Sequence, residues 1–309
     1  MDVLSEILAL SHVSSSVLSE IDCRGDWAID MLDKSVAATS QWHAMPFHYV
    51  LDGEAYLRHG ETHSLLHAGD LIVAPGWPPH AIVSHPKSVA IAITDLISAN
   101  GLEVWDGSTI SRPVTFVAGD GKSVTRLLSG VFTIKGHAAD MLMSQFPPLM
   151  KLSVGDDTID EQFATALSFM HQEGQKERPG YVAVAERMTD LLFIQIIRSC
   201  TSIAEMQSGL FAALADKSIA RALKAIHEDP SVPWTVSSLA KKAGLSRTVF
   251  AKRFHTLVGV TPIQYLTRWR LIVAEDMLLR SDLPVGEIQA RLGFSSSFAF
   301  SRAFRFAFG

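Results

Sequence analysis

Apolar residues in the first half of the chain come in short runs, and pairs of turn-forming residues interrupt them. Between residues 20 and 150 these pairs are Asp52-Gly53, His59-Gly60, Gly69-Asp70, Pro75-Gly76 and Asp106-Gly107. Short apolar runs separated by such turns are typical of sandwiches and barrels. The pattern predicts a hairpin strand over residues 48–57 that turns at Asp52-Gly53, and a short buried strand over residues 71–74.

After Pro147-Pro148 the apolar spacing becomes helical. Helices are predicted over residues 158–172 and 181–198, with a linker over residues 201–209. The apolar positions of the second helix are Val184, Met188, Leu191, Leu192 and Ile196. Such a stripe fits a helix packed on the barrel and equally a helix that pairs two subunits, because the stripe does not say what covers it.

The last third of the chain is predicted to be entirely helical. Ile219, Leu223 and Ile226 recur at helical spacing. Thr261-Pro262 predicts a helix start, since a hydroxyl cap followed by proline suits the first turn. That helix is expected to run to about Arg280 and to bury Leu266, Trp269, Val273 and Met277.

This helical region contains an internal repeat. Gly244 and Gly293 align at an offset of 49 residues, whereas Phe250 and Phe254 align with Phe300 and Phe304 at an offset of 50. The second copy is therefore expected to carry one extra residue early in its last helix.

Each position of the repeat has a structural reason. The two glycines supply the left-handed residue that ends a short helix. Ser246 and Ser295 are expected to cap the helices that follow. The four phenylalanines are spaced by four within each copy, so they are expected to lie on one buried face. The pattern predicts two helix-turn-helix motifs joined by a long helix.

The residues opposite the phenylalanines are the candidate DNA contacts, because a helix fits the major groove and Arg or Lys pairs with guanine edges there. Lys252 and Arg302 occupy equivalent positions of the repeat, and both are basic. The full candidate set is Arg247, Thr248, Ala251, Lys252, Ser296, Ser297, Phe298, Ser301, Arg302 and Arg305.

The charge distribution supports a polyanionic partner for the same region. The net charge of the chain is −5, but residues 216–309 hold 14 basic and 7 acidic residues, a net of +7. The remaining 215 residues therefore carry −12. A basic segment on an acidic body favours binding of a polyanion such as DNA.

The region after Asp216 resembles the DNA-binding domain of the AraC/XylS family. The motifs that carry the resemblance are Trp234-Thr235-Val236, Gly244-Leu245-Ser246, Thr261-Pro262, Gly293-Phe294 and Phe300-Ser301-Arg302-Ala303-Phe304. The resemblance implies that each recognition helix enters one of two adjacent major-groove segments. Gln289 stands where the family favours a small residue, and its longer side chain is expected to loosen the second motif.

The first two thirds resemble the cupin-type sensor half of one branch of these regulators. The resemblance rests on Cys23 with Trp27, on residues 47–55 and on residues 68–80. It implies a barrel with an effector pocket, for which His48, Tyr56, Trp77 and His80 are the candidate lining residues.

A metal centre and catalysis are not expected in this barrel. The ligand positions of metal-binding cupins fall at Thr39, Gln41 and Pro46, and only His80 occupies a ligand position. His43, His48 and His80 form the alternative ligand set, because three imidazoles can hold a metal ion. The two cysteines, Cys23 and Cys200, have no zinc-ligand spacing and fit a reducing compartment.

Together these observations predict an α+β protein: a cupin-like β-barrel with accessory helices over residues 1–205, and an all-α tandem helix-turn-helix domain over residues 206–309. The expected function is sequence-specific transcription regulation in response to a small molecule, without enzymatic activity or a cofactor. The expected partners are promoter double-stranded DNA, a small-molecule effector, a second copy of the chain and, for an activator, RNA polymerase.

The expected location is the cytoplasm, because residues 1–20 lack a signal-peptide pattern. Two alternatives remain open. One is a metal-dependent cupin enzyme fused to a DNA-tethering domain. The other is a regulator shortened at Gly309, where the family continues with a short tail, that acts only by hetero-dimerisation.

Overall fold

The computed structural model describes residues 2–11, 13–31, 43–102, 114–153, 161–176, 179–202 and 209–308. The chain divides into two compact units, each described here by itself. The sheet unit comprises Val13–Ile134 and Phe146–Ser202, and the helical unit comprises Met1–His12, Lys135–Gln145 and Ile203–Gly309. Two short segments from the first half of the sequence thus fold with the C-terminal helices.

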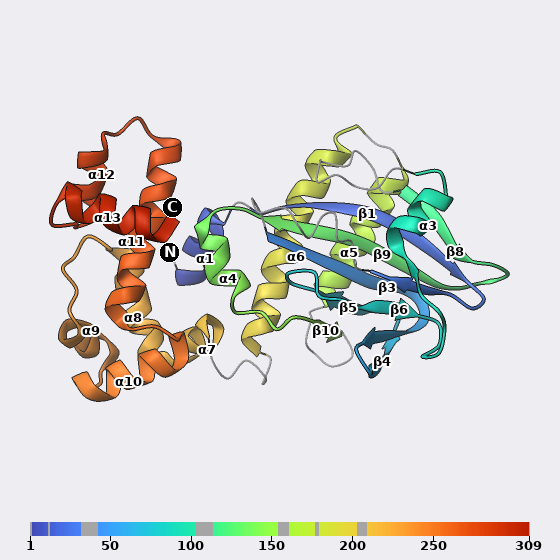
Figure 1. Ribbon diagram of the computed structural model, residues 1–309, viewed down its shortest axis with the longest axis horizontal. Helices are drawn as coiled ribbons and strands as arrows, with labels where there is room; N and C mark the ends of the chain where they lie inside the picture. Colours follow the sequence, from blue (N-terminus) through green and yellow to red (C-terminus); the bar gives the residue numbers. More distant parts are fainter. Residues whose placement is uncertain are drawn as a thin grey trace. The chain divides into compact units, whose positions relative to one another are not determined.

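The sheet unit is a curled sheet that forms a half-barrel, as the cupin resemblance implied (Figure 1). Its described strands are β1 (Val13–Arg24), β2 (Ala28–Asp30), β3 (His43–His59), β4 (Thr62–His67), β5 (Asp70–Val73), β6 (Ala81–Val83), β7 (Ile91–Ala92), β8 (Val114–Gly119), β9 (Ser123–Ile134) and β10 (Met150–Ser153). They follow the order β7-β2-β6-β3-β9-β1-β8, while β4 and β5 pair with β3, and β10 pairs with β5. One short helix, α3 (Ile93–Ala99), follows β7.

The long strand β3 joins the two parts of this sheet. Its first part pairs with β9 and β5, and its second part with β4 and β6. The predicted turn at Asp52-Gly53 is wrong: the strand continues through it with a bulge between Val50 and Asp52. Gly53 has φ +82°, and a Cβ there would collide with the carbonyl oxygen of Val124, so only glycine fits. The hairpin turn lies at Gly60 instead, between β3 and β4.

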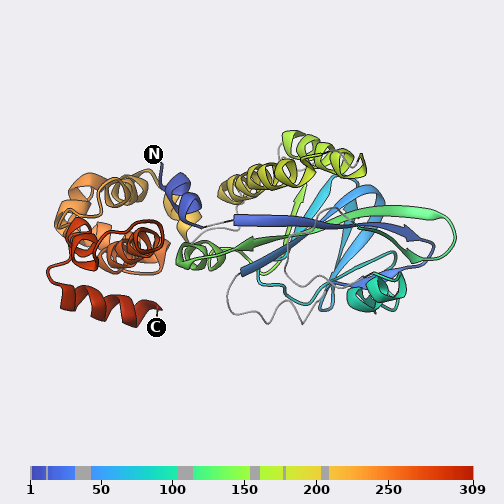
Figure 2. The same cartoon turned by 90° about the horizontal axis from the view of Figure 1, so that it is seen from above.

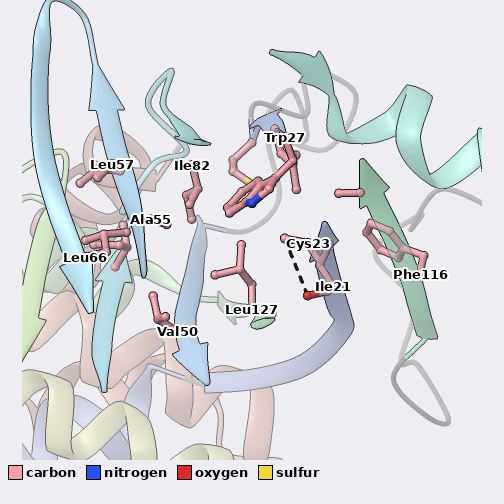
Figure 3. Packing of buried hydrophobic residues seen from close by; sticks show 14 residues of the cluster. Ile21, Cys23, Trp27, Val50, Ala55, Leu57, Leu66, Ile82, Phe116 and Leu127 are labelled. Carbon is pink, nitrogen blue, oxygen red and sulfur yellow. Dashed lines mark hydrogen bonds between the residues drawn. The ribbon is translucent and has the colours of Figure 1, made fainter. Parts of the chain in front are cut away.

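The inner face of the sheet carries a hydrophobic core (Figure 3). Its members alternate along the strands, as one face of a sheet requires. They include Ile21, Cys23, Trp27, Met31, Val50, Leu57, Ile72, Ile82, Phe116 and Leu127. The opposite face is covered by α6 (Tyr181–Ser202), which contacts β1 and α5 (Glu161–Gln175). Phe193 of α6 packs on Phe132 of β9, with ring centroids 5.4 Å apart, so this helix packs on the sheet (Figure 2).

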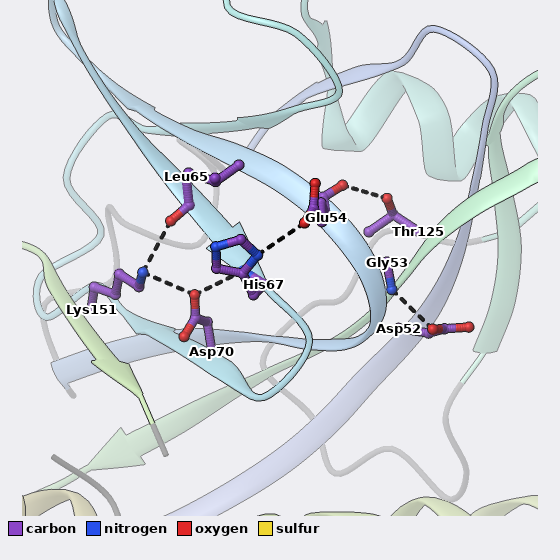
Figure 4. A network of polar contacts seen from close by, with 8 residues as sticks. All are labelled: Asp52, Gly53, Glu54, Leu65, His67, Asp70, Thr125 and Lys151. Carbon is purple, nitrogen blue, oxygen red and sulfur yellow. Dashed lines mark hydrogen bonds and ion pairs between the residues drawn. The ribbon is translucent and has the colours of Figure 1, made fainter. Parts of the chain in front are cut away.

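The predicted buried strand is present as β5, and Asp70 at its start fixes the turn before it (Figure 4). The Asp70 carboxylate accepts a hydrogen bond from the backbone N–H of His67 at 2.8 Å and lies 2.9 Å from Lys151 Nζ. Lys151 also donates to the carbonyl oxygen of Leu65. A buried carboxylate needs such partners, because an unpaired charge is costly to bury.

The helical unit holds the remaining helices of the described part of the chain. They are α1 (Val3–Leu10), α4 (His137–Met143), α7 (Leu210–Ala215), α8 (Lys217–Glu228), α9 (Val236–Ala243), α10 (Arg247–Val258), α11 (Pro262–Arg280), α12 (Val285–Arg291) and α13 (Ser297–Phe308). Thr261 caps α11 through a capping box, as predicted. Leu266 and Trp269 are buried, and Val273 and Met277 pack against the core of the second motif.

The helix α1 is part of this unit although it comes first in the sequence. Val3 and Ile7 are buried, and α1 contacts α4, α8 and α11. In the same unit His227 packs on Trp269, with ring centroids 3.9 Å apart and an angle of 30° between the ring planes. His227 Nε2 lies 2.8 Å from the Tyr265 hydroxyl, and Nδ1 lies 3.2 Å from the Glu6 carboxylate. A neutral imidazole satisfies both, since Nδ1–H donates to Glu6 while Nε2 accepts from Tyr265.

Burial decides the protonation of this histidine. It lowers the pKa of His227 to about 3, because the charged ring would lose its hydration. The Glu6 carboxylate favours the protonated form, but burial dominates. Glu6, His227 and Tyr265 form a hydrogen-bonded network, and Trp269 packs on the histidine ring without a hydrogen bond of its own.

Candidate nucleic-acid interface and ligand pocket

The first helix-turn-helix motif consists of α9 and α10, and capping residues at the helix ends define its turn. Thr235 forms a capping box with Ser238 at the start of α9. Gly244 ends α9 in the left-handed conformation with φ +70°. Ser246 Oγ accepts a hydrogen bond from Val249 N, so the predicted cap is confirmed. Arg221 of α8 donates to the carbonyl oxygen of Ala243 at 2.7 Å and so satisfies the end of α9.

The second motif, α12 and α13, has a longer turn. Gly293 is left-handed with φ +71°, and a Cβ there would collide with the carbonyl oxygen of Ser231. The predicted cap at Ser295 is wrong, because Ala299 N donates to Ser296 Oγ at 3.1 Å. From glycine to cap the chain takes two steps in the first motif and three in the second. The extra residue therefore lies in the turn and not, as expected, in the helix.

Gln289 bridges this longer turn. Its Nε2 donates to the carbonyl oxygen of Phe294 at 2.7 Å, and its Oε1 accepts from Ser297 Oγ at 3.0 Å. The expectation that Gln289 loosens the second motif is therefore wrong: its side chain connects α12 to the first residue of α13. In the first motif the equivalent residue, Ala240, is buried and too short for such a bridge.

Arg270 of α11 ties the two motifs together. Its guanidinium donates to the carbonyl oxygens of Pro230 at 2.6 Å and Val232 at 2.9 Å, in the segment that precedes α9. It also donates to the carbonyl oxygen of Gly293, in the turn of the second motif, at 3.2 Å. Partial burial lowers the pKa of Arg270. A planar guanidinium with five donors suits this bracketing role.

The recognition helices α10 and α13 bury the phenylalanines as predicted. Phe250, Phe254 and Phe300 are buried, and Phe304 packs against the core of the second motif. Of the ten candidate DNA contacts, Ala251 is half-buried, and the other nine are exposed: Arg247, Thr248, Lys252, Ser296, Ser297, Phe298, Ser301, Arg302 and Arg305. Two helices thus present basic, largely exposed faces with Lys252 and Arg302 at equivalent positions.

The four candidate effector residues do not all lie together. His48 and His80 are neighbours, with ring centroids 5.2 Å apart, and both are buried. Trp77 lies near His80, because the Trp77 indole N–H donates to the carbonyl oxygen of Met31 and Met31 N donates to that of His80. Tyr56 alternates with the inward-facing Ala55 and Leu57, and packs on a separate cluster with Ala28 and Val83.

The two imidazoles leave polar atoms without protein partners. His48 Nδ1 lies 2.8 Å from Ser129 Oγ, and His80 Nδ1 donates to the carbonyl oxygen of Pro78 at 2.8 Å. Both Nε2 atoms are buried without a hydrogen-bond partner. The bond to Pro78 fixes the His80 tautomer, so its Nε2 presents a lone pair. Burial lowers the pKa of both rings.

The described residues include both cysteines and the three histidines of the alternative metal-ligand set, His43, His48 and His80. No group of three or more His, Cys, Asp or Glu side chains that could hold a metal ion occurs among them. Of the metal-ligand positions, Thr39 and Gln41 lie outside the described residues. Cys23 and Cys200 are buried, and burial raises the pKa of both thiols, to about 12 for Cys200. Buried neutral thiols of this kind are poor nucleophiles.

Two family models match successive parts of the chain. A cupin family model matches residues 2–202, and a helix-turn-helix domain model matches residues 239–309. The transcriptional regulator AlkR of Acinetobacter baylyi is 29% identical, with 99% of this chain and 95% of that protein covered. A putative AraC-like transcription regulator of Streptomyces antibioticus is 29% identical over 100% of this chain and 96% of its own length.

A solved structure matches the C-terminal part. The DNA-binding domain of AdpA, a global transcriptional factor crystallised with a target DNA, is 33% identical. The match covers 30% of this chain and 84% of that one, with a TM-score of 0.29.

In the part of the chain that the structure describes, no helix is long and apolar enough to cross a membrane.

The cupin match spans most of the chain, and the alignments with the two relatives extend over nearly the full length of both proteins. The chain belongs to the AraC-type transcriptional regulators, DNA-binding proteins in which a helix-turn-helix domain follows an N-terminal cupin domain.

Proposed function

We propose that the tandem motif places α10 and α13 in successive major-groove segments of a promoter, and that a small molecule in the half-barrel controls this binding. The observation that carries the proposal is the pair of exposed recognition faces with Lys252 and Arg302 at equivalent positions. Lys252 and Arg302 contact base edges, while Arg247 and Arg305, at the ends of the helices, contact phosphates.

The two kinds of contact predict two kinds of mutant. Lys252→Ala and Arg302→Ala each cost about 1–3 kcal/mol and relax preference at one base position. Arg305→Ala weakens binding to all sequences alike, because phosphates carry no sequence information. Selection of the full chain and its variants against a randomised duplex library measures both effects. Lys224→Ala, an exposed lysine on α8 outside both motifs, is the control. Identical preferences in all variants would refute the assignment.

We infer that the effector pocket lies beside the buried pair His48 and His80, near Trp77. The Nε2 atoms of His48 and His80 are buried without hydrogen-bond partners. Each such atom costs about 1–3 kcal/mol of folding free energy, and a bound molecule that hydrogen-bonds to it would offset this cost. Trp77 is also the only described non-glycine residue with positive φ, at +55°. Strained buried residues are a feature of ligand sites. A ligand changes DNA affinity only through its differential affinity for two states of the protein.

The effector proposal is tested in a reporter strain. His80→Phe and Trp77→Ala should change the response to inducing conditions while leaving the sequence selected by the DNA-binding helices unchanged. Tyr56→Phe, on the separate cluster, is the matched control. An unaltered response in both pocket variants would refute the pocket.

We further propose that the chain acts as a cytoplasmic homodimer, that it contacts RNA polymerase when it activates transcription, and that it catalyses no reaction. Light scattering of the purified chain tests the dimer. Stoichiometric iron, manganese or nickel in the purified protein would instead favour the alternative, a metal-dependent cupin enzyme tethered to DNA.

A further inference from the structure

The second recognition helix begins with an exposed aromatic side chain. Phe298 is 77% exposed, in the first turn of α13. Ser301 and Arg302 follow it at the i+3 and i+4 positions, so the three share one face. A single exposed phenylalanine is ordinary on a protein surface. Phe298 is of interest because it follows the capping residue Ser296 and shares a helix face with the basic residue Arg302.

The residues just before Phe298 use their side chains within the protein. Ser296 Oγ accepts from Ala299 N, and Ser297 Oγ donates to Gln289 Oε1. Gln289 also donates a hydrogen bond to the carbonyl oxygen of Phe294 and thereby fixes the turn before α13. Among the described residues of α13, Phe298 is therefore the first exposed side chain that no hydrogen bond or ring contact holds, whereas Ser297, although exposed, is held by Gln289.

The major groove offers one apolar group that such a side chain can recognise. Only the thymine edge carries a methyl group there, and apolar side chains, phenylalanine included, contact it. Arg302, one turn further along, matches the two acceptors of guanine. The first motif has Thr248 at the position equivalent to Phe298, and its hydroxyl can hydrogen-bond to several base edges.

We propose that Phe298 determines specificity in the second half of the operator by contacting the 5-methyl group of a thymine. This rests on the proposed DNA recognition by α13. The first half of the operator is then read mainly through polar and charged side chains, and the second half through one apolar and one cationic contact.

Removal of a single methyl group from the DNA tests the proposal. The full chain selects its preferred sequence from a randomised duplex library, and the shift in preference of Arg302→Ala locates the second half. Each thymine in that half is then replaced by uracil, which lacks only the methyl group. One replacement should weaken binding about fourfold, the effect of burying one such group.

The same replacement in the Phe298→Ala variant should have no effect, and Phe298→Leu should restore part of it. Phe306→Ala, which removes a 94%-exposed phenylalanine from the last turns of the same helix, is the matched control and should keep the full response to uracil.

Two outcomes overturn the proposal in distinguishable ways. If uracil is tolerated at every thymine, or Phe298→Ala stays as sensitive as the parent, the role of Phe298 is wrong while DNA recognition stands. If the library yields no enriched sequence, the proposed DNA recognition itself fails.

Discussion

The first and second helix-turn-helix motifs hold their recognition helices in different ways. In the first, the helix caps and Arg221 close a short turn around Gly244. In the second, a turn that is one residue longer is spanned by the side chain of Gln289. The extra residue in the turn and the long Gln289 side chain, in place of Ala240, both occur in the second motif. The longer side chain therefore compensates for the longer turn. A repeat can therefore keep its recognition geometry while the local means of holding it change.

Replacement of the buried phenylalanines is the strongest test of whether the two motifs act separately. Phe250 and Phe300 occupy equivalent positions in different cores. Replacement of either by alanine should cost about 3–5 kcal/mol of folding free energy. Urea unfolding measures this loss. In footprinting, Phe300→Ala should lose protection over one half of the operator and Phe250→Ala over the other. Loss of the same half in both variants would show that the motifs do not act separately.

The second-largest difference between the two motifs is expected in their response to acid. The core beside the first motif contains His227, with a pKa of about 3, whereas the described core of the second motif is apolar. The unfolded state, with an ordinary histidine pKa, binds more protons between about pH 6.5 and 3, so stability falls as the pH drops through this window. The loss is on the order of 2 kcal/mol at pH 5.

Thermal unfolding followed at pH 7 and pH 5 checks this. His227→Phe should reduce the pH dependence, although Glu6 then loses its partner. His255→Gln, which removes an exposed histidine from α10, should leave the pH dependence as it is. A variant at His227 with the full acid response would contradict the assignment.

The bridge at Gln289 gives the smallest effect. Gln289→Met keeps the length of the side chain but loses both hydrogen bonds, and should cost about 1 kcal/mol. Its effect on DNA should be confined to the half of the operator bound by α13. Deletion of Ser295 together with Gln289→Ala restores the spacing of the first motif and should bind better than Gln289→Ala alone. Worse binding by the double variant would mean that the longer turn is not what Gln289 compensates.

The sequence predicts most of the DNA-binding region because its signals are local. The glycines, the phenylalanine spacing and the Thr261-Pro262 start each act within a few residues, and the structure agrees with all of them. The cap at Ser295 was wrong because three consecutive serines, Ser295, Ser296 and Ser297, are chemically equivalent candidates. Only the actual length of the turn selects among them.

The sheet was harder to predict in detail. Asp-Gly is a strong turn signal, but at Gly53 the same backbone freedom serves a bulge, because β9 pairs across that position. The helix α4 lies in a stretch expected to form strands. The sequence pattern does not predict it, because seven residues are too few to show helical periodicity. The neighbourhood of His48 and His80 depends on pairing between distant strands, which local patterns do not contain.

The position of α1 has a consequence for the order in which the protein is made. Glu6 and His227 are separated by 221 positions in the sequence. During synthesis Val3 and Ile7 leave the ribosome long before α8 and α11, which cover them. Domains generally fold from the N-terminus as they emerge, and contacts between distant positions form late. The unit that binds DNA is therefore the last to close, and a nascent chain cannot complete it before the strands of the half-barrel have been synthesised.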